Sequence, residues 1–420
     1  MKTYSFTALG CKVNQYEIRT IAAQLQDYGL QMVPFGEKAD LCIINTCCVT
    51  AESEAKSRKM IARARRNSPD AVVVITGCYA QIAKECPSGV DLLVPNTEKE
   101  QCVDKIVAYL SEHGVNLKKE QNPHFHYVTH DRTRATVKVQ DGCDSFCSYC
   151  IIPYARGPIS SKPIADAEKE VRRLVDCGFK EVILTGIHLT RYGRDRDNKE
   201  DLTDLIEHIS RIDGLERIRL GSMEPGYLTP PVVARLAAVD KLCPHFHLSL
   251  QSGCKATLAR MNRKYTPEQY YQEIQALRQY FPNCAITTDV MTGFPGETEE
   301  EFVESMNFVE KCEFAKVHVF TYSVRPGTVA AQMEQIPQSV RHARCRQMIQ
   351  ASERGRKQFL LDAIGKEYTV LLEREHGDEI HGLTPNYISV SVPSDQGKSN
   401  ELIRVKIVAV EEDGCVGVRI

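Results

Sequence analysis

Cys143-Asp-Ser-Phe-Cys147-Ser-Tyr-Cys150 places three thiols on one short loop, directly after the strand-like run Thr136-Val-Lys-Val-Gln140. Thiolates are soft ligands that suit iron, and three of them can hold three irons of a 4Fe-4S cluster. The fourth iron is then open to a small molecule, whereas a structural zinc site closes all four positions. The next cysteine, Cys177, ends a predicted helix rather than forming a second knuckle. We therefore expect a catalytic cluster rather than a zinc ribbon or unrelated buried thiols.

The loop resembles the signature of the radical S-adenosylmethionine enzymes. The resemblance implies that Cys143, Cys147 and Cys150 are the catalytic metal ligands and that S-adenosylmethionine chelates the open iron. Electron transfer into the sulfonium gives methionine and a 5′-deoxyadenosyl radical, so the difficult chemistry belongs to the cofactor and the protein orients it.

Length and composition limit which classes of protein the chain can belong to. The chain has 420 residues, of which 42% are hydrophobic and 17 are cysteine. This length predicts more than one domain. The first residues lack a signal peptide, and no run approaches the roughly 18 apolar residues of a membrane span, so we expect a cytoplasmic protein with no membrane partner. Cytosolic thiols stay reduced, which favours metal or catalytic sulfur over disulfides.

Charge is unevenly distributed along a chain whose net charge is −2. Residues 55–66 hold six cations and no carboxylate, and residues 341–357 hold six cations and one carboxylate. Such clusters can neutralise phosphates and steer RNA, although most charge runs are only solvated helix faces.

The first 130 residues alternate β-branched runs with helical patterns, which predicts an open parallel sheet with helices on its faces. The predicted strands are Tyr4 to Leu9, Leu41 to Thr46, Ala71 to Thr76 and Leu92 to Val94. A helix over residues 14–28 is predicted between the first two, with Asn14 and Glu17 spaced as a capping box.

Three cysteines follow three of these strands. Cys11, Cys47 and Cys78 each come directly after a strand or one turn beyond it. The carboxyl ends of parallel strands share one edge, where ligands bind, so the three sulfurs should converge. Spacing alone leaves two interpretations open: a second three-cysteine cluster, or three buried core cysteines.

The middle third repeats a strand-then-helix unit, which predicts a partial (β/α)6 barrel with function gathered on the loops after the strands. The predicted strands cover residues 136–140, 181–185, 217–221, 246–250, 285–290 and 316–321, and the helices cover 163–177, 201–212, 230–239, 266–281 and 299–311.

Polar and glycine-rich segments follow these strands and supply the predicted cofactor contacts. Glu224, Gln251, Ser252 and Asp289 could bind ribose hydroxyls or the amino acid end of S-adenosylmethionine. Glycine permits close backbone approach to a ligand. The complete predicted set is Gly186, Glu224, Gln251, Ser252, Gly253, Arg263, Asp289 and Gly293.

The tail carries alternating runs at 367–372, 388–392, 403–408 and 415–420, which predict a small OB-like β-barrel. It holds ten acidic and six basic residues from Gly365 onward. The predicted domains are therefore residues 1–117, a polar histidine-rich linker at 118–134, a core at 135–363 and the barrel at 364–420.

Taken together, these motifs resemble the methylthiotransferases of the radical S-adenosylmethionine class, with an N-terminal methylthiotransferase domain, a radical domain and a TRAM domain. The motifs that carry the resemblance are Leu-Gly-Cys11-Lys-Val-Asn, Asn-Thr-Cys47, Gly-Cys78, Asp-Gly-Cys143 through Cys150, Leu-Gln251-Ser-Gly253, Met261-Asn-Arg263-Lys-Tyr and Gly293-Phe-Pro-Gly-Glu. The resemblance implies that Cys11, Cys47 and Cys78 hold an auxiliary 4Fe-4S cluster that supplies or carries sulfur.

Within that family, Gly-Cys11-Lys-Val-Asn-Gln-Tyr-Glu, Asn-Thr-Cys-Cys-Val-Thr50 and Thr185-Gly-Ile-His resemble the enzymes that methylthiolate N6-threonylcarbamoyladenosine at position 37 of tRNA. The alternatives are N6-isopentenyladenosine in tRNA, a ribosomal-protein aspartate, or a non-catalytic iron-sulfur protein that binds RNA. The implied partners are the tRNA anticodon loop and a low-potential electron donor such as flavodoxin or ferredoxin. The base must leave the loop stack to react, which a single-stranded loop permits.

Overall fold

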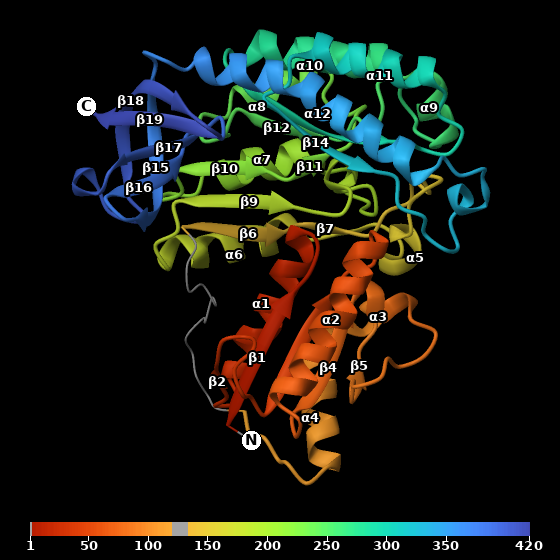
Figure 1. The fold of residues 1–420 in the computed structure, drawn as a ribbon. Coiled ribbons are helices and arrows are strands. Elements are labelled where there is room, and N and C mark those ends of the chain that lie inside the picture. The colour runs from red at the N-terminus through yellow and green to blue at the C-terminus, as the bar shows by residue number, and fades with distance from the viewer. Residues whose placement is uncertain (1, 120–132) are drawn as a thin grey trace. The chain divides into compact units, whose positions relative to one another are not determined.

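The computed structural model describes residues 2–119 and 133–420 (Figure 1). Its described residues form two compact units. Unit 1 is drawn from Met1–His130, Asp141–Ile159 and Ser323–Ala331, and unit 2 from Asp131–Gln140, Ser160–Tyr322 and Gln332–Ile420. Most of the predicted linker, including its histidines, lies outside the described residues. The predicted domain boundaries at 117, 134 and 363 stay predictions.

Unit 1 is built on a five-stranded parallel sheet in the order β2-β1-β3-β4-β5. The four predicted strands are confirmed to within one residue at each end, and β2 is an additional short strand. The strands are β1 (Thr3–Ala8), β2 (Gln31–Met32), β3 (Leu41–Thr46), β4 (Val72–Gly77) and β5 (Leu92–Leu93).

Alternation along the strands buries both faces of this sheet. Leu41 and Ile43 pack with α1 (Lys12–Gln26) and α4 (Cys102–Glu112), whereas Cys42 and Ile44 pack with α2 (Ala51–Asn67) and α3 (Cys78–Ile82). The doubly covered arrangement confirms the predicted open α/β sheet, and Figure 1 shows the helices lying along it.

The start of α1 corrects one prediction. The helix begins at Lys12, with Cys11 as its N-cap, so Asn14 and Glu17 do not form a capping box. Both residues lie within the helix, and both side chains are buried. Asn14 Nδ2 donates instead to Leu9 O at 2.8 Å and Thr46 O at 3.0 Å. Tertiary partners therefore override the local capping pattern.

Unit 2 contains the predicted partial barrel. Its parallel strands form two sheets, β6-β9-β10 and β11-β12-β13-β14, which meet where Cys243 N donates to Ile218 O at 2.8 Å. The strands are β6 (Arg134–Lys138), β9 (Glu181–Thr185), β10 (Arg217–Leu220), β11 (Ser222–Met223), β12 (His245–Leu248), β13 (Ala285–Thr292) and β14 (Lys316–Thr321). The covering helices are α6 (Ile164–Asp176), α7 (Leu202–Ser210), α8 (Pro230–Ala237), α9 (Lys255–Arg260), α10 (Pro267–Tyr280) and α11 (Glu299–Cys312).

A long helix and a closed β-barrel complete unit 2. The helix, α12 (Gln338–Leu361), carries the second basic segment. The barrel order β15-β16-β17-β19-β18 confirms the predicted small barrel, with β16 as a strand that the sequence did not predict. Its strands are β15 (Glu367–His376), β16 (Glu379–Leu383), β17 (Ser389–Pro393), β18 (Leu402–Glu411) and β19 (Gly414–Arg419). Within residues 2–119 and 133–420, no helix combines the length and apolar character needed to cross a bilayer.

Candidate active site

The three N-terminal cysteines lie at one edge of the unit 1 sheet. Cys11 follows β1, Cys47 follows β3, and Cys78 follows β4, and these three strands are adjacent and parallel. The backbone before Cys11 lies close to Cys47, because a Cβ added to Gly10 would be 2.7 Å from Cys47 Sγ. The structure therefore brings this predicted trio together.

Polar groups surround this edge. Ser57 Oγ accepts from Cys47 N and donates to Cys47 O, each at 3.1 Å, which fixes the turn after β3. Among the described residues, Asn45 Oδ1, Thr76 Oγ1 and Asn96 Oδ1 are buried without a hydrogen-bond partner. Buried polar atoms are rarely left unpaired, so their presence beside the thiols indicates a site built for more than apolar packing.

The charges around Cys78 favour its thiolate. A hydrogen bond from the Cys48 thiol and the nearby Arg156 guanidinium hold the pKa of Cys78 well below its ordinary value, against the opposing effect of burial. Burial raises the pKa of Cys47. Cys48 is fully buried and packs against Cys78, Ile151 and Ala155.

The Cys143–Cys150 loop belongs to unit 1, together with the N-terminal trio. Its base is closed where Cys143 N donates to Gly157 O at 3.1 Å, and its tip turns where Cys150 N donates to Cys147 O at 2.9 Å. The loop leads into the short helix α5 (Ile152–Arg156), whose Ile152 N approaches Cys150 Sγ at 3.4 Å. All three cysteines are half-buried, and they lie on one loop that these two hydrogen bonds shape.

Each trio has the donor set of an iron-sulfur cube with one open corner. Within residues 2–119 and 133–420, no three His, Cys, Asp or Glu side chains are placed to hold a single metal ion. A cube presents three separate irons to its three thiolates, so its ligands need not meet at one point. At the N-terminal trio, the shared sheet edge, the lowered pKa of Cys78 and the unpaired polar atoms in the described residues fit that group.

A buried charge network adjoins the N-terminal trio in unit 1, and the sequence did not predict it. Arg156 contacts Cys78 and binds the carboxylates of Glu17 and Asp141, and Lys99 binds the same two carboxylates. The one available signal was Glu17, a carboxylate six residues after Cys11 on the buried face of an amphipathic helix. Its spacing from Asn14 instead indicates a capping box.

In unit 2, two predicted cofactor residues are paired with each other. Arg263 binds Glu224 and also donates to Ser249 O at 3.2 Å. Asp289 on β13 lies 3.2 Å from His247 Nε2. Glu224 directly follows β11, and Asp289 is the fifth of the eight residues of β13.

Gln251 is the predicted contact with the most unusual geometry. Its φ is +66°, a left-handed conformation that costs a non-glycine residue free energy and is common at functional sites. Its backbone is held on both sides, because Gln251 N donates to Asp289 O and Met291 N donates to Gln251 O, each at 2.8 Å. In the described structure its Oε1 is buried without a hydrogen-bond partner. The side chain thus retains an acceptor suited to a polar ligand.

The remaining predicted contacts each have a packing role. A Cβ on Gly186 would lie 2.7 Å from Gln140 Oε1, and a Cβ on Gly293 would lie 2.2 Å from Arg341 Cγ. Gly253 N donates to Ser305 Oγ at 2.8 Å, and Ser252 is fully buried beside it. Internal packing already accounts for these residues, and their contact with a cofactor stays a prediction.

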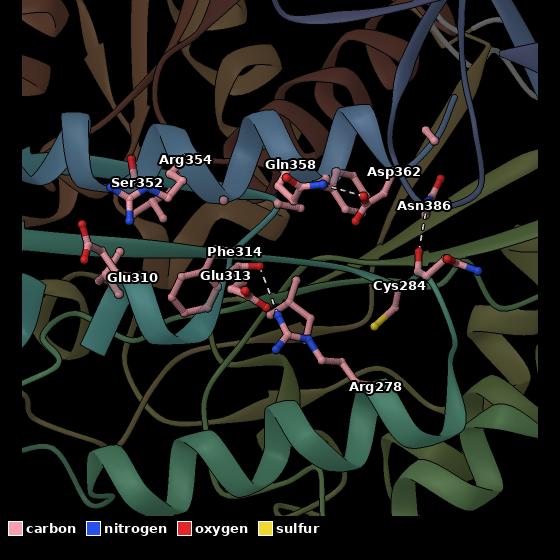
Figure 2. A pocket seen from close by; sticks show the side chains of 18 of the residues that line it. Arg278, Cys284, Glu310, Glu313, Phe314, Ser352, Arg354, Gln358, Asp362 and Asn386 are labelled. Carbon is pink, nitrogen blue, oxygen red and sulfur yellow. Dashed lines mark hydrogen bonds between the residues drawn. The ribbon is translucent and has the colours of Figure 1, made fainter. Parts of the chain in front are cut away.

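A cavity of about 570 Å³ lies at the other end of the strands, between α10, α11, α12 and the closed barrel. Figure 2 shows Arg354, Gln358 and Asp362 of α12 on one side and Arg278 of α10 on the other. Arg278 Nη2 donates to Cys312 O at 2.6 Å, Gln358 Nε2 to Asp362 Oδ1 at 2.7 Å. The lining mixes both charges and includes Ile286 of β13 and Ala315, the residue before β14. The cavity therefore lies at the amino ends of these strands.

The barrel and the three-cysteine loop after its first strand define a radical S-adenosylmethionine protein, and a model of the Radical SAM superfamily matches residues 137–309. A model described as Uncharacterized protein family UPF0004 matches residues 3–90. The solved structure of the radical S-adenosylmethionine methyltransferase TsrM from Kitasatospora setae matches with a TM-score of 0.59 at 14% identity, covering 79% of this chain and 75% of that one, which supports the fold alone.

Sequence relatives define the family more narrowly. The threonylcarbamoyladenosine tRNA methylthiotransferase MtaB of Bacillus subtilis is 38% identical, covering 97% of this chain and 94% of the relative. The tRNA-2-methylthio-N(6)-dimethylallyladenosine synthase of Moorella thermoacetica is 32% identical, covering 98% of this chain and 96% of the relative. The chain belongs to the radical S-adenosylmethionine tRNA methylthiotransferase family.

Proposed function

We propose that the chain methylthiolates C2 of N6-threonylcarbamoyladenosine at position 37 of tRNA. The observation that carries this function is the placement of six cysteines, as two trios, in one compact unit. Relatives named for threonylcarbamoyladenosine reach 38% identity, whereas those named for dimethylallyladenosine reach 33%. This difference favours the threonylcarbamoyl substrate over the isopentenyl one.

The cofactors are two 4Fe-4S clusters and S-adenosylmethionine. Bound at their sites, they supply a radical that removes the C2 hydrogen, a sulfur atom for insertion at C2, and a methyl group from a second S-adenosylmethionine. Cys143, Cys147 and Cys150 hold one cluster in this proposal, and Cys11, Cys47 and Cys78 hold the other.

The residues of unit 2 bind and orient S-adenosylmethionine in this proposal. Gln251 is the strongest candidate, because its buried Oε1 lacks a partner among the described residues and its backbone is strained. Glu224 and Asp289 are half-buried carboxylates that can accept from ribose hydroxyls or from the amino group, and Arg263 holds Glu224 in place. Contact of the cofactor with Gly186, Ser252, Gly253 and Gly293 completes this proposal.

The tRNA partner is supported by two features of unit 1. Five cations of α2 are exposed, which suits phosphate contacts: Lys56, Arg58, Lys59, Arg63 and Arg66. Phe146 and Tyr154, on and beside the cysteine loop, expose 52% and 58% of their surface and pack edge to face at 5.7 Å. Exposed rings of this kind stack on unpaired bases. The enzyme acts in the cytoplasm in this proposal, with a low-potential donor such as flavodoxin or ferredoxin.

Nucleoside mass spectrometry tests the substrate. In tRNA from a strain that lacks the gene, we expect the methylthio group to be missing from threonylcarbamoyladenosine and restored by the intact chain. Loss from isopentenyladenosine instead would identify the other tRNA substrate, and no change in tRNA would point to a protein aspartate.

Anaerobic incubation with reductant and S-adenosylmethionine tests whether the protein is an enzyme. We expect release of 5′-deoxyadenosine, which the C147A variant should abolish. A protein whose clusters are only structural and which merely binds RNA would release none.

A further inference from the structure

The Arg156 guanidinium contacts Cys78 of the N-terminal trio and Asp141, which shortly precedes the Cys143–Cys150 loop. Its side chain has no solvent exposure, and its Nε donates to Cys78 Sγ at 3.2 Å. Arg156 is the last residue of α5, six residues after Cys150. A cation at hydrogen-bond distance from a thiol is well placed to stabilise the thiolate that a cluster requires.

The remaining donors of Arg156 bind groups that flank both trios. Nη1 donates to Glu17 Oε1 at 2.7 Å and to Asp141 Oδ1 at 3.2 Å, and Nη2 donates to Glu17 Oε2 at 3.2 Å and to Asn14 Oδ1. Asn14 and Glu17 lie on the helix that starts after Cys11, whereas Asp141 precedes Cys143 by two residues. One side chain therefore contacts the segments that carry Cys11, Cys78 and the Cys143–Cys150 loop.

A second cation completes the charge balance. Lys99 Nζ, on the 3-10 turn Asn96–Gln101, lies 3.1 Å from Glu17 Oε1 and also binds Asp141. Two cations thus face two carboxylates, while Arg156 Nε is directed to sulfur. On the same turn, Asn96 Nδ2 donates to Ala155 O at 2.7 Å and approaches Cys78 Sγ at 3.8 Å.

We propose that Arg156 is a positioning residue that fixes the distance between the two clusters and adjusts the reduction potential of the auxiliary one. The inference rests on the proposed ligation of the clusters by the two trios. A hydrogen bond from a cation to a cluster sulfur stabilises the more reduced, more negative state, so it makes the potential less negative. The paired carboxylates keep the guanidinium from turning away from Cys78.

The experiment compares R156Q and R156K with R219Q, a control that breaks another fully buried arginine–glutamate pair, Arg219–Glu181 at 2.7 Å in unit 2. The auxiliary potential is measured by spectroelectrochemical titration in a C143A/C147A/C150A background. Spin coupling between the clusters is measured by electron paramagnetic resonance of the fully reduced protein with all six cysteines.

We expect R156Q to make the auxiliary potential more negative and to change the spin coupling. R156K should shift the potential less, because it keeps the charge, yet still change the coupling, because one ammonium cannot hold Cys78 and both carboxylates together. R219Q should change neither. A potential and a coupling in R156Q equal to those of the parent would overturn the proposal and leave Arg156 as a purely structural ion pair.

Two further measurements keep the outcome decisive. If R156Q does not fold, the spin coupling between the clusters in R156K tests the proposal. A coupling in R156K equal to that of the parent overturns it. Iron content of C78A and C147A tests the ligation itself: each should lose about half of the roughly eight irons. An iron content in C78A and C147A equal to that of the parent would refute the assignment of the clusters to the two trios, independently of the result for Arg156.

Discussion

Gly77 shows how little room a single residue has beside Cys47 and Cys78. Its φ is +93°, and an added Cβ would lie 2.1 Å from Asn45 Oδ1 and 2.5 Å from Thr46 O. Backbone atoms cannot move aside cheaply, so β3 and β4 would have to separate just before Cys47 and Cys78. We expect G77A to lower iron content from about eight to about four per chain, measured by iron and sulfide analysis after anaerobic reconstitution.

Gly114 provides the matched control for this substitution. It also has a positive φ, +81°, but an added Cβ would meet nothing within 4 Å. G114A therefore tests backbone strain alone and should cost about 1 kcal/mol with no loss of iron. Equal iron in G77A and G114A would contradict the importance of this close approach.

At this scale the sequence predicts where the three cysteines meet better than it predicts which residues contact them. Cys11, Cys47 and Cys78 could be found because strand periodicity identifies strand ends, and parallel strands bring those ends together. Arg156 and Glu17 could not, because their roles depend on contacts 139 residues apart along the chain. Side-chain pairing over such a separation has no local pattern.

The cysteine loop and α5 present the two exposed rings to the solvent. If Tyr154 stacks on an unpaired base, Y154A should raise the Kd for tRNA about tenfold, since one base stack contributes about 1–3 kcal/mol. The salt dependence of binding should stay unchanged, because no phosphate contact is lost. Fluorescence anisotropy over a salt series measures both quantities.

Tyr280, which is 38% exposed at the end of α10 in unit 2, gives the control for that measurement. Y280A should leave tRNA affinity as it is. Parental affinity in Y154A, or an equal loss in both variants, would count against the cysteine loop as the base-stacking surface.

Helix α10 carries a buried carboxyl whose titration should appear in the stability of the protein. Burial raises the pKa of Glu273 to about 7, although the N–H groups of Gly226 and Leu228 partly oppose the shift. Between its ordinary pKa of 4.5 and about 7, the native state holds a proton that the unfolded state has released. Stability should therefore fall as pH rises through this window, by about 1 kcal/mol between pH 6 and pH 8.

The variant E273Q removes this titration and should flatten the profile, as measured by denaturant unfolding at pH 6 and pH 8. E268Q, on the same helix, is the control, because hydrogen bonding to Thr266 lowers the pKa of Glu268 and keeps it ionised across that range. A parental slope in E273Q would show that another group causes the pH dependence.

Elements with apolar periodicity were predicted well, and α12 shows why others were not. The sequence marked residues 341–357 only as basic and as possible RNA contacts. In the structure Arg344 binds Glu297 at 2.9 Å, and Arg356 binds Asp413 at 2.7 Å. These cations hold the helix against the rest of unit 2, so the helix needs few apolar residues and its 3.6-residue pattern is faint.

At the scale of the whole molecule, the two compact units do not follow the order of the motifs along the chain. The Cys143–Cys150 loop follows β6 of unit 2 in sequence, yet it belongs to unit 1 with the other trio. The geometry between the two cysteine trios is therefore set inside one compact unit. Sequence patterns could not show this, because they reveal which strand a loop follows but not which core it packs on.

Unit 2 depends in turn on a buried charge cluster that fastens the closed barrel to the strands. Arg217 donates to Leu383 O at 2.9 Å and to Thr369 O at 2.7 Å. Arg219 donates to Pro385 O at 2.9 Å, binds Glu181 at 2.7 Å and lies over the Tyr387 ring at 4.8 Å. Guanidinium groups can satisfy several carbonyls at once, which suits a join between two sheets of different type.

Removing Arg219 should cost far more than removing a surface arginine. R219A deletes these carbonyl contacts and leaves the buried Glu181 with Arg217 at 3.6 Å as its remaining close cation in the described structure. Breaking a buried pair typically costs about 3–5 kcal/mol, whereas R419A, in an exposed pair with Glu401, should cost less than about 1 kcal/mol. Denaturant unfolding measures both, and iron content should stay near that of the parent because all six proposed ligands belong to unit 1. A loss in R219A no larger than in R419A would mean that other contacts suffice to hold the barrel.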